Sequence, residues 1–164
     1  IGVMVREYSE ELSGRISFIL DCSPVPAENG ERRVDWAVRC AGSLIFAALD
    51  VGHHAELIDL AELEFMAIPP FSGGDAILER LARVKEAGTA SSHNDFDKAL
   101  AALSNKSAIC MILTSPSTAS AETASGLAAK RRTVSAYLPA KYMGGNFDGG
   151  GCSVKYYTEN SIVE

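Results

Sequence analysis

Hydrophobic residues follow two kinds of spacing along this chain, one typical of strands and one typical of helices. Short, mostly apolar runs occupy residues 15–21 (RISFILD) and 107–113 (SAICMIL). Short runs of this kind, bounded by polar residues, indicate strands that are buried on both faces of a sheet. Between residues 34 and 48, apolar residues instead recur three or four positions apart. That spacing places them along one side of a helix and predicts a buried helical face.

The remaining segments extend this alternation of strands and helices. Residues 55–60 and 63–68 are strand-like runs separated by two residues, which predicts a hairpin that Pro69 and Pro70 then stop. The later apolar spacing predicts three helices, within residues 73–88, 94–103 and 117–130, and a last buried strand at residues 133–138. Asn94 or Asp95 is expected to cap the second of these three helices.

Strands that alternate with helices imply a parallel sheet covered on both faces. We therefore expect an α/β fold, a Rossmann-like three-layer sandwich whose mostly parallel sheet has one antiparallel edge strand, supplied by the hairpin. Residues 1–139 are expected to form this domain, and residues 140–164 a glycine-rich C-terminal extension that is either irregular or a final hairpin. The chain begins at Ile1 and runs directly into strand-like residues 3–8. We therefore expect a fragment of a longer protein, whose upstream part could hold a membrane anchor.

Composition narrows the classes of function. A net charge of −6 argues against a duplex nucleic-acid partner, which normally meets a basic face, and the basic run at residues 130–132 is interpreted as a solvated helix end. No stretch reaches the ~18 apolar residues that a membrane span needs. The four cysteines show no C-x-x-C spacing, which argues against a zinc site or a disulfide framework. A reducing compartment, the cytoplasm, is the simpler expectation.

Candidate functional residues lie where the buried strands end, because loops after the C-terminal ends of parallel strands form the usual binding crevice. Asp21, Cys22 and Ser23 follow the first strand, and Thr114 and Ser115 follow the strand at residues 107–113. Asp21 could ligate a metal, act as a catalytic acid, or only bond to its own loop. Cys22 could be a nucleophile, or only a small residue in a tight loop.

The histidines differ in how near they are expected to lie to this crevice. His53 and His54 follow the end of a helix that points away from the crevice in this topology, so they are poor catalytic partners for Asp21. His93 lies in a loop closer to the crevice and is the histidine that could act there, although a surface role is the simpler interpretation.

The order of these segments resembles a known family. Residues 4–8 (MVREY) and then 16–23 (ISFILDCS) resemble a pattern of the domain-of-unknown-function family numbered 58, in which V-R-E-F/Y precedes a strand ending in L-D-x-S. The helix containing residues 37–44, the hairpin, the stop at residues 68–70 and the helix at residues 78–84 follow in the family's order. The resemblance covers roughly residues 1–115.

That family is similar to von Willebrand factor A domains. Its bacterial members are often paired with a MoxR-type AAA+ ATPase, and many carry N-terminal membrane segments. The resemblance therefore implies a non-catalytic module that binds other proteins and assists their assembly or maturation.

Von Willebrand factor A domains often carry a metal-ion-dependent adhesion site, with D-x-S-x-S in a first loop, threonine in a second and aspartate in a third. By this resemblance the corresponding residues are Asp21, Ser23, Asn94 and Ser115, whereas Val25 has no oxygen to offer. One carboxylate remains where two are expected, and a unit charge 4 Å from a cation contributes about 4 kcal/mol at an effective dielectric of 20. We therefore expect a degenerate site with at most weak Mg²⁺ binding, and no other cofactor.

Three hypotheses result. The first is a non-catalytic protein-interaction module with a degenerate adhesion site. The second is a functional Mg²⁺-dependent adhesion domain that uses Asp21, Ser23, Asn94 and Ser115. The third is a hydrolase or transferase whose reactive groups are Asp21, Cys22 or His93, and it requires those side chains to converge within hydrogen-bonding distance.

Overall fold

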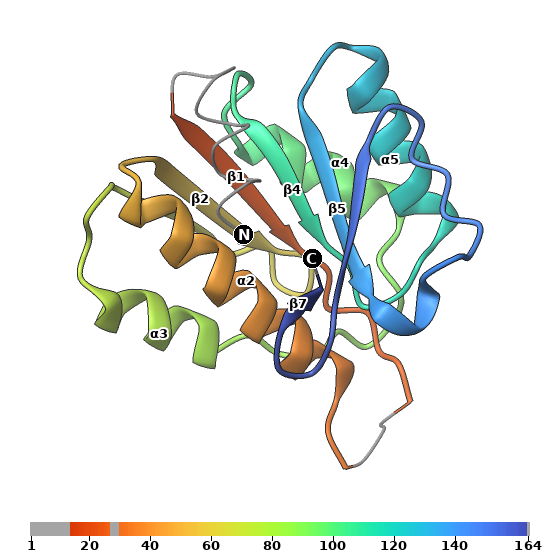
Figure 1. Ribbon diagram of the computed structural model, residues 1–164, viewed down its shortest axis with the longest axis horizontal. Coiled ribbons are helices and arrows are strands. Elements are labelled where there is room, and N and C mark those ends of the chain that lie inside the picture. The colour runs from red at the N-terminus through yellow and green to blue at the C-terminus, as the bar shows by residue number, and fades with distance from the viewer. Residues whose placement is uncertain (1–13, 27–29, 164) are drawn as a thin grey trace.

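The buried apolar runs form the centre of a seven-stranded sheet. The structure is a computed structural model that describes residues 14–26 and 30–163, so the strand-like residues 3–8 lie outside the described part (Figure 1). Strand β1 (Arg15–Leu20) pairs in parallel with β2 (His54–Asp59) on one side and with β4 (Ala108–Ile112) on the other. The strand order is β3-β2-β1-β4-β5-β6-β7, with β3 (Phe65–Ile68), β5 (Val134–Pro139), β6 (Ser153–Tyr157) and β7 (Ile162–Val163).

Helices cover both faces of the sheet, which makes three layers. Helices α2 (Arg33–Asp50) and α3 (Gly74–Ala82) lie on one face, and α4 (His93–Ala102) and α5 (Thr118–Ala129) lie on the other (Figure 1). Alternate residues of β1 serve the two cores: Phe18 packs in the cluster that contains α2 and α3, and Ile19 in the cluster that contains α4 and α5. The predicted α/β sandwich with a mostly parallel sheet is confirmed.

The predicted hairpin is present, but its connection is longer than expected. Strand β3 pairs antiparallel with β2 and begins at Phe65, because residues 60–64 form the turn. The Asp59 carboxylate accepts hydrogen bonds from the amides of Glu62 (2.8 Å) and Glu64 (3.3 Å), which holds this turn closed. Leu63 adopts a φ of 57°, a left-handed conformation that a continuing strand does not allow.

Two helix ends also differ from the sequence prediction. Helix α3 ends at Ala82 rather than near Gly88, although Val84 still packs against the core beyond the helix. Helix α4 is capped by Ser92, not by Asn94 or Asp95. The Ser92 hydroxyl accepts from the Asp95 amide, and the Asp95 carboxylate accepts from the Ser92 amide, so the two form a capping box.

The sheet continues beyond the expected domain boundary at Pro139. After a short 3₁₀ helix (Ala140–Tyr142), β6 adds to β5 in parallel and β7 pairs antiparallel with β6. The glycine-rich residues therefore connect strands of the same sheet, and both edge strands, β3 and β7, are antiparallel to their neighbours. Adding β6 also covers the outer edge of β5, which would otherwise expose unpaired backbone groups.

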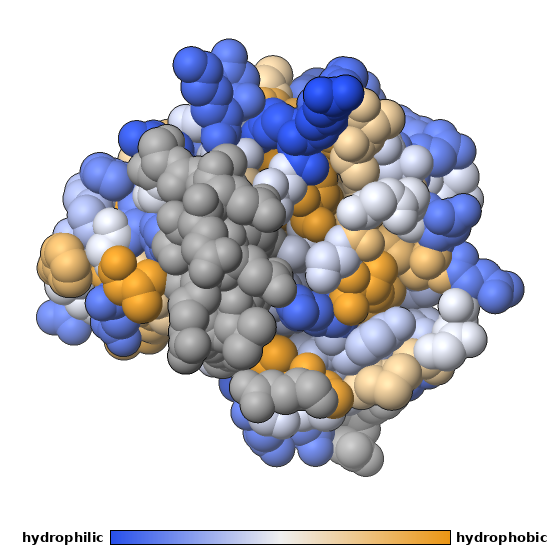
Figure 2. Space-filling view, turned by 45° about the horizontal axis from the view of Figure 1, so that its top comes forward, coloured by the Kyte–Doolittle hydropathy of each residue, from blue (hydrophilic) through white to orange (hydrophobic). Residues whose placement is uncertain are grey.

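The surface is mixed in character. Within residues 14–26 and 30–163, no helix is both long enough and apolar enough to span a bilayer. On the face shown in Figure 2, hydrophobic residues form separate patches among hydrophilic ones rather than a continuous apolar surface.

Candidate functional site

Asp21 lies at the C-terminal edge of the parallel strands, directly after β1. Its amide donates to the carbonyl of Ile112 at the end of β4 (2.9 Å), so the β1 and β4 loops leave the sheet side by side. The side chain is 4% exposed. A carboxylate buried to this degree requires hydrogen bonds or a counter-charge to offset its lost hydration.

Three loops supply the hydrogen bonds to this carboxylate. Its Oδ1 accepts from the Ser23 amide (3.0 Å), the Ser23 hydroxyl (2.5 Å) and the Ser91 hydroxyl (2.9 Å). Its Oδ2 accepts from the Thr114 amide (3.2 Å) and hydroxyl (3.0 Å). Together, these five bonds connect the loop after β1, the segment before α4 and the loop after β4. We call Asp21, Ser23, Ser91 and Thr114 the Asp21 cluster.

Two of the four sequence-predicted ligand residues lie outside this cluster. In the segment before α4, the residue that bonds to Asp21 is Ser91 and not Asn94. The Ser92 cap places Asn94 inside the first turn of the helix, where its side chain is exposed. In the loop after β4, the residue that bonds to Asp21 is Thr114 and not Ser115. The amide and the hydroxyl of Thr114 both donate to Oδ2 of Asp21.

The oxygens of the Asp21 cluster fit Mg²⁺ poorly. Mg²⁺ prefers near-octahedral oxygens at ~2.0–2.1 Å and is usually held by one or two carboxylates. Here Asp21 is the one carboxylate of the cluster, and both its oxygens are engaged by donors. A hydroxyl can offer a lone pair to a cation while it still donates to Asp21. Asp21 itself, however, would have to give up hydrogen bonds to ligate a cation, because its two oxygens accept five donors. Across the described ranges, no group of three or more histidine, cysteine, aspartate or glutamate side chains could hold a metal.

Cys22 is poorly prepared for nucleophilic chemistry. Its thiol is fully buried and donates to the Leu20 carbonyl at 3.6 Å. Burial, and then the negative charges of Asp59 and Asp21, raise the pKa of Cys22 to about 12. The thiolate is the reactive form, so a raised pKa keeps the group inert near neutral pH.

The histidines do not converge on Asp21. His93 opens α4, and its Nε2 lies 3.0 Å from the Glu122 carboxylate of α5 on the surface. His53 directly precedes β2 and His54 is its first residue, so both lie at the opposite edge of the sheet from Asp21, as the topology predicted. The side chains that the third hypothesis needs together are therefore not in contact.

Arg33 is a charged neighbour of the Asp21 cluster that sequence reasoning missed. It is the first residue of α2, is 2% exposed and donates from Nη1 to the Thr114 carbonyl at 3.1 Å. The guanidinium lies 4.7 Å from the centre of the Trp36 ring and 6.0 Å from that of Tyr142. Nearby, the Tyr157 hydroxyl donates to the Leu113 carbonyl (2.7 Å). A charged residue beside the apolar stripe of a helix is ordinarily read as solvated, so the spacing alone gives no sign of this burial.

A buried ion pair borders the same edge of the sheet. Asp59, the last residue of β2, lies 2.5 Å from Nη2 of Arg80 on α3, and both side chains are almost fully buried. Arg80 also donates to the Glu64 carbonyl at 2.7 Å. This pair fastens α3 to the end of β2 beside Cys22.

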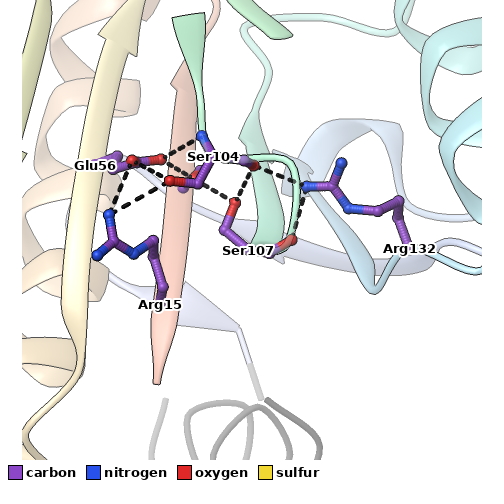
Figure 3. Close-up of polar contacts among 6 residues, drawn as sticks. Arg15, Glu56, Ser104, Ser107 and Arg132 are labelled. Carbon is purple, nitrogen blue, oxygen red and sulfur yellow. Dashed lines mark hydrogen bonds and ion pairs between the residues drawn. The ribbon is translucent and has the colours of Figure 1, made fainter. Parts of the chain in front are cut away.

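A second polar network occupies the opposite edge of the sheet (Figure 3). The buried carboxylate of Glu56 on β2 accepts from the Ser17 hydroxyl (2.5 Å), from the Ser104 amide and hydroxyl, and from Arg15 (3.3 Å). Burial alone would raise the pKa of Glu56, but these hydrogen bonds leave it below its usual value. Arg132 closes the network by donating to the carbonyls of Ser104 and Ser107. The network links β1, β2 and the loop before β4, and its bonds are made within the chain.

Two surface hollows lined by described residues lie away from the Asp21 cluster. One of about 450 Å³ lies between β3 and the start of α3, lined by Met66–Pro69 and Ser72–Ile77. Another of about 280 Å³ lies between α4 and α5, next to His93 and Glu122. Neither is lined by a member of the Asp21 cluster, so neither gives Asp21 access to an enclosed substrate.

Comparison with known proteins does not assign the chain to a family. No protein-family model matches it, and no curated protein matches it.

Proposed function

We propose that this chain is a non-catalytic, von Willebrand factor A-like module that binds another protein at the edge of the sheet bearing the Asp21 cluster. The observation that carries the proposal is the saturation of Asp21 by donors from three loops. The bonds hold the loops in one arrangement, and a rigid edge of this kind suits recognition of a protein surface.

From the family resemblance, we propose that the partner is a MoxR-type AAA+ ATPase. The module then assists this ATPase in assembling or maturing other proteins. From the same resemblance, we also propose that the module lies in the cytoplasm, on a parent chain that is anchored in the membrane. The four cysteines are free, three of them buried, which fits a reducing compartment. The strand order, with β3 antiparallel at one edge and the D-x-S loop after β1, fits the architecture that the resemblance implies.

A second candidate is a Mg²⁺-dependent adhesion domain. What favours it is that three hydroxyl side chains from three loops meet at one carboxylate, as such a site requires. In this candidate, the ligands are the members of the Asp21 cluster rather than Asn94 and Ser115. The single carboxylate and the need to break its hydrogen bonds make it the weaker of the two.

Co-purification of the full-length protein tests the proposal and separates the two candidates. We expect an AAA+ ATPase to accompany the protein equally in Mg²⁺ and in EDTA. Exposed Pro24, next to Ser23, allows a surface variant, Pro24→Glu, that should reduce the amount recovered; exposed Asn105, at the opposite edge, allows a control of equal charge change, Asn105→Glu. Absence of the ATPase contradicts the proposed partner. Loss of the ATPase in EDTA favours the Mg²⁺-dependent domain.

A further inference from the structure

The edge of the sheet where the parallel strands begin is rich in cations. Strands β1, β2, β4 and β5 are parallel and in register, so all four begin at this edge, opposite the Asp21 cluster. The residues at and just before these strand starts are 14–15, 50–54, 103–107 and 130–133. They include a single acidic residue, Asp50, in a chain whose net charge is −6. We call their five cations the basic edge: Arg15, Lys106, Lys130, Arg131 and Arg132.

Hydrogen bonds from two arginines hold the loops of the basic edge together (Figure 3). Arg132 donates from Nη2 to the carbonyls of Ser104 (3.3 Å) and Ser107 (2.8 Å). From the other side, Arg15 donates to the Ser104 hydroxyl (3.4 Å). Lys106 lies between these two serines in the sequence, so its loop is fastened on both sides. Its charge is therefore held on the same edge as those of the two arginines.

Three charges of the basic edge are not neutralised by the described part of the chain. Arg15 pairs with Glu56 at 3.3 Å. Lys106, Lys130 and Arg131 are exposed, and no acidic side chain among the described residues pairs with any of them. Like charges on one edge repel one another, so an anionic partner there gains their attraction and relieves that repulsion.

Arg131 has a backbone conformation that favours glycine. It follows the end of α5 with a φ of 61°, and its amide donates to the Ala128 carbonyl (2.9 Å), while the Arg132 amide donates to the Leu127 carbonyl (3.0 Å). Glycine is usual at such a helix end, because a side chain is strained in the left-handed region. A cation suits the helix dipole here, but Lys130 and Arg132 already supply one on either side. Arg131 therefore adds charge to the basic edge although it strains the backbone.

We infer that the basic edge binds a short acidic segment of a second protein. A short segment fits better than a membrane or a long nucleic acid, because the rest of the chain is acidic and repels anions that extend beyond the edge. The four segments of this edge contain no phenylalanine, tyrosine or tryptophan on which the bases of a single strand could stack. This binding surface is separate from the Asp21 cluster and does not depend on the proposed function.

Fluorescence anisotropy of a fluorescein-labelled polyglutamate peptide tests the inference. We expect the chain to bind the peptide with an affinity that falls as salt is added. Lys106→Glu should weaken binding about ten-fold, because it replaces attraction by repulsion. Lys85→Glu makes the same charge change beside Glu62 at the opposite edge, and should change the affinity less than about two-fold. Equal affinities of Lys106→Glu and the wild type overturn the inference.

Arg131→Gly separates a binding role from a structural one. Glycine removes both the charge and the strain, so the folding equilibrium constant from urea unfolding should stay equal or rise. The affinity for polyglutamate should nevertheless fall about three-fold. A lower folding constant with unchanged affinity would assign Arg131 to the helix end alone and contradict the inference. Tighter binding of single-stranded DNA or of phosphatidylserine vesicles than of polyglutamate would also overturn the inferred partner.

A further variant keeps this surface distinct from the one that the ATPase co-purification tests. Asn105→Glu, next to Lys106, should also weaken polyglutamate binding but leave recovery of the ATPase unchanged. Failure to recover an ATPase therefore contradicts only the proposed function, and failure to bind polyglutamate contradicts only the inference about the basic edge.

Discussion

Replacing Arg80 by methionine should be one of the most damaging single changes in this chain. Arg80→Met preserves much of the side-chain length but leaves the Asp59 carboxylate, 2% exposed, without its cation. Removing one partner of a buried ion pair typically costs about 3–5 kcal/mol, because an uncompensated charge remains in the interior. For a chain of this length each kcal/mol lowers the melting temperature by about 2–4 °C, so the expected loss is roughly 6–20 °C.

Arg83 offers a matched control on the same turn of the chain. It lies 2.7 Å from the Glu64 carboxylate, yet it is half exposed. Surface ion pairs contribute about 0.2–1 kcal/mol, so Arg83→Met should lower the melting temperature by less than about 4 °C. Differential scanning calorimetry of the two variants and the wild type makes the comparison. Equal shifts for Arg80→Met and Arg83→Met would refute the reasoning, because burial would then have no bearing on the cost.

Three further predictions concern the two polar clusters and the thiol. Because the pKa of Glu56 is lowered from 4.5 in the folded state, its contribution is fully present above that value and is lost as the pH falls through the folded pKa. Urea unfolding between about pH 5 and 3 should lose stability more steeply in the wild type than in Glu56→Gln; parallel curves would exclude this role. Ser91→Ala, which removes a hydroxyl bonded to Asp21, should cost about 1–3 kcal/mol in urea unfolding, whereas Asn94→Ala should change stability by less than about 0.5 kcal/mol. The reverse ranking would restore Asn94 to the site. Cys22, with its pKa raised to about 12, should react with a disulfide reagent at pH 8 only after the protein unfolds; rapid labelling of the folded chain at Cys22 would contradict its burial.

The sequence predicts the centre of this fold well, because burial on both faces leaves an unambiguous apolar run. Residues 15–21 and 107–113 emerge as paired strands, and the apolar stripe from residue 34 emerges as α2. The ends of elements are less predictable, because they depend on side-chain hydrogen bonds that periodicity does not record. Asp59, for example, closes the turn before β3 and shortens the hairpin.

Side-chain hydrogen bonds that periodicity does not record also decide which residues of the candidate site can be predicted from the sequence. Asp21 and Ser23 are predictable from their place after a buried strand. The helix start that the sequence predicts points to Asn94, whereas the Ser92–Asp95 capping box sets a different start and brings Ser91 to Asp21 instead. Serine three residues before an acidic residue is a capping signal that was available in the sequence. Arg33 left no such signal, because its burial depends on loops that follow β4 and β5 far along the chain.

The most direct test of the account is isothermal titration calorimetry of Mg²⁺ into the wild-type chain. We expect no heat of specific binding, because both oxygens of Asp21 are already engaged by five hydrogen-bond donors of the chain. Asp21→Ala, measured alongside, should give the same trace as the wild type. Tight binding of Mg²⁺ that disappears in Asp21→Ala would contradict the account and establish the Mg²⁺-dependent adhesion domain in its place.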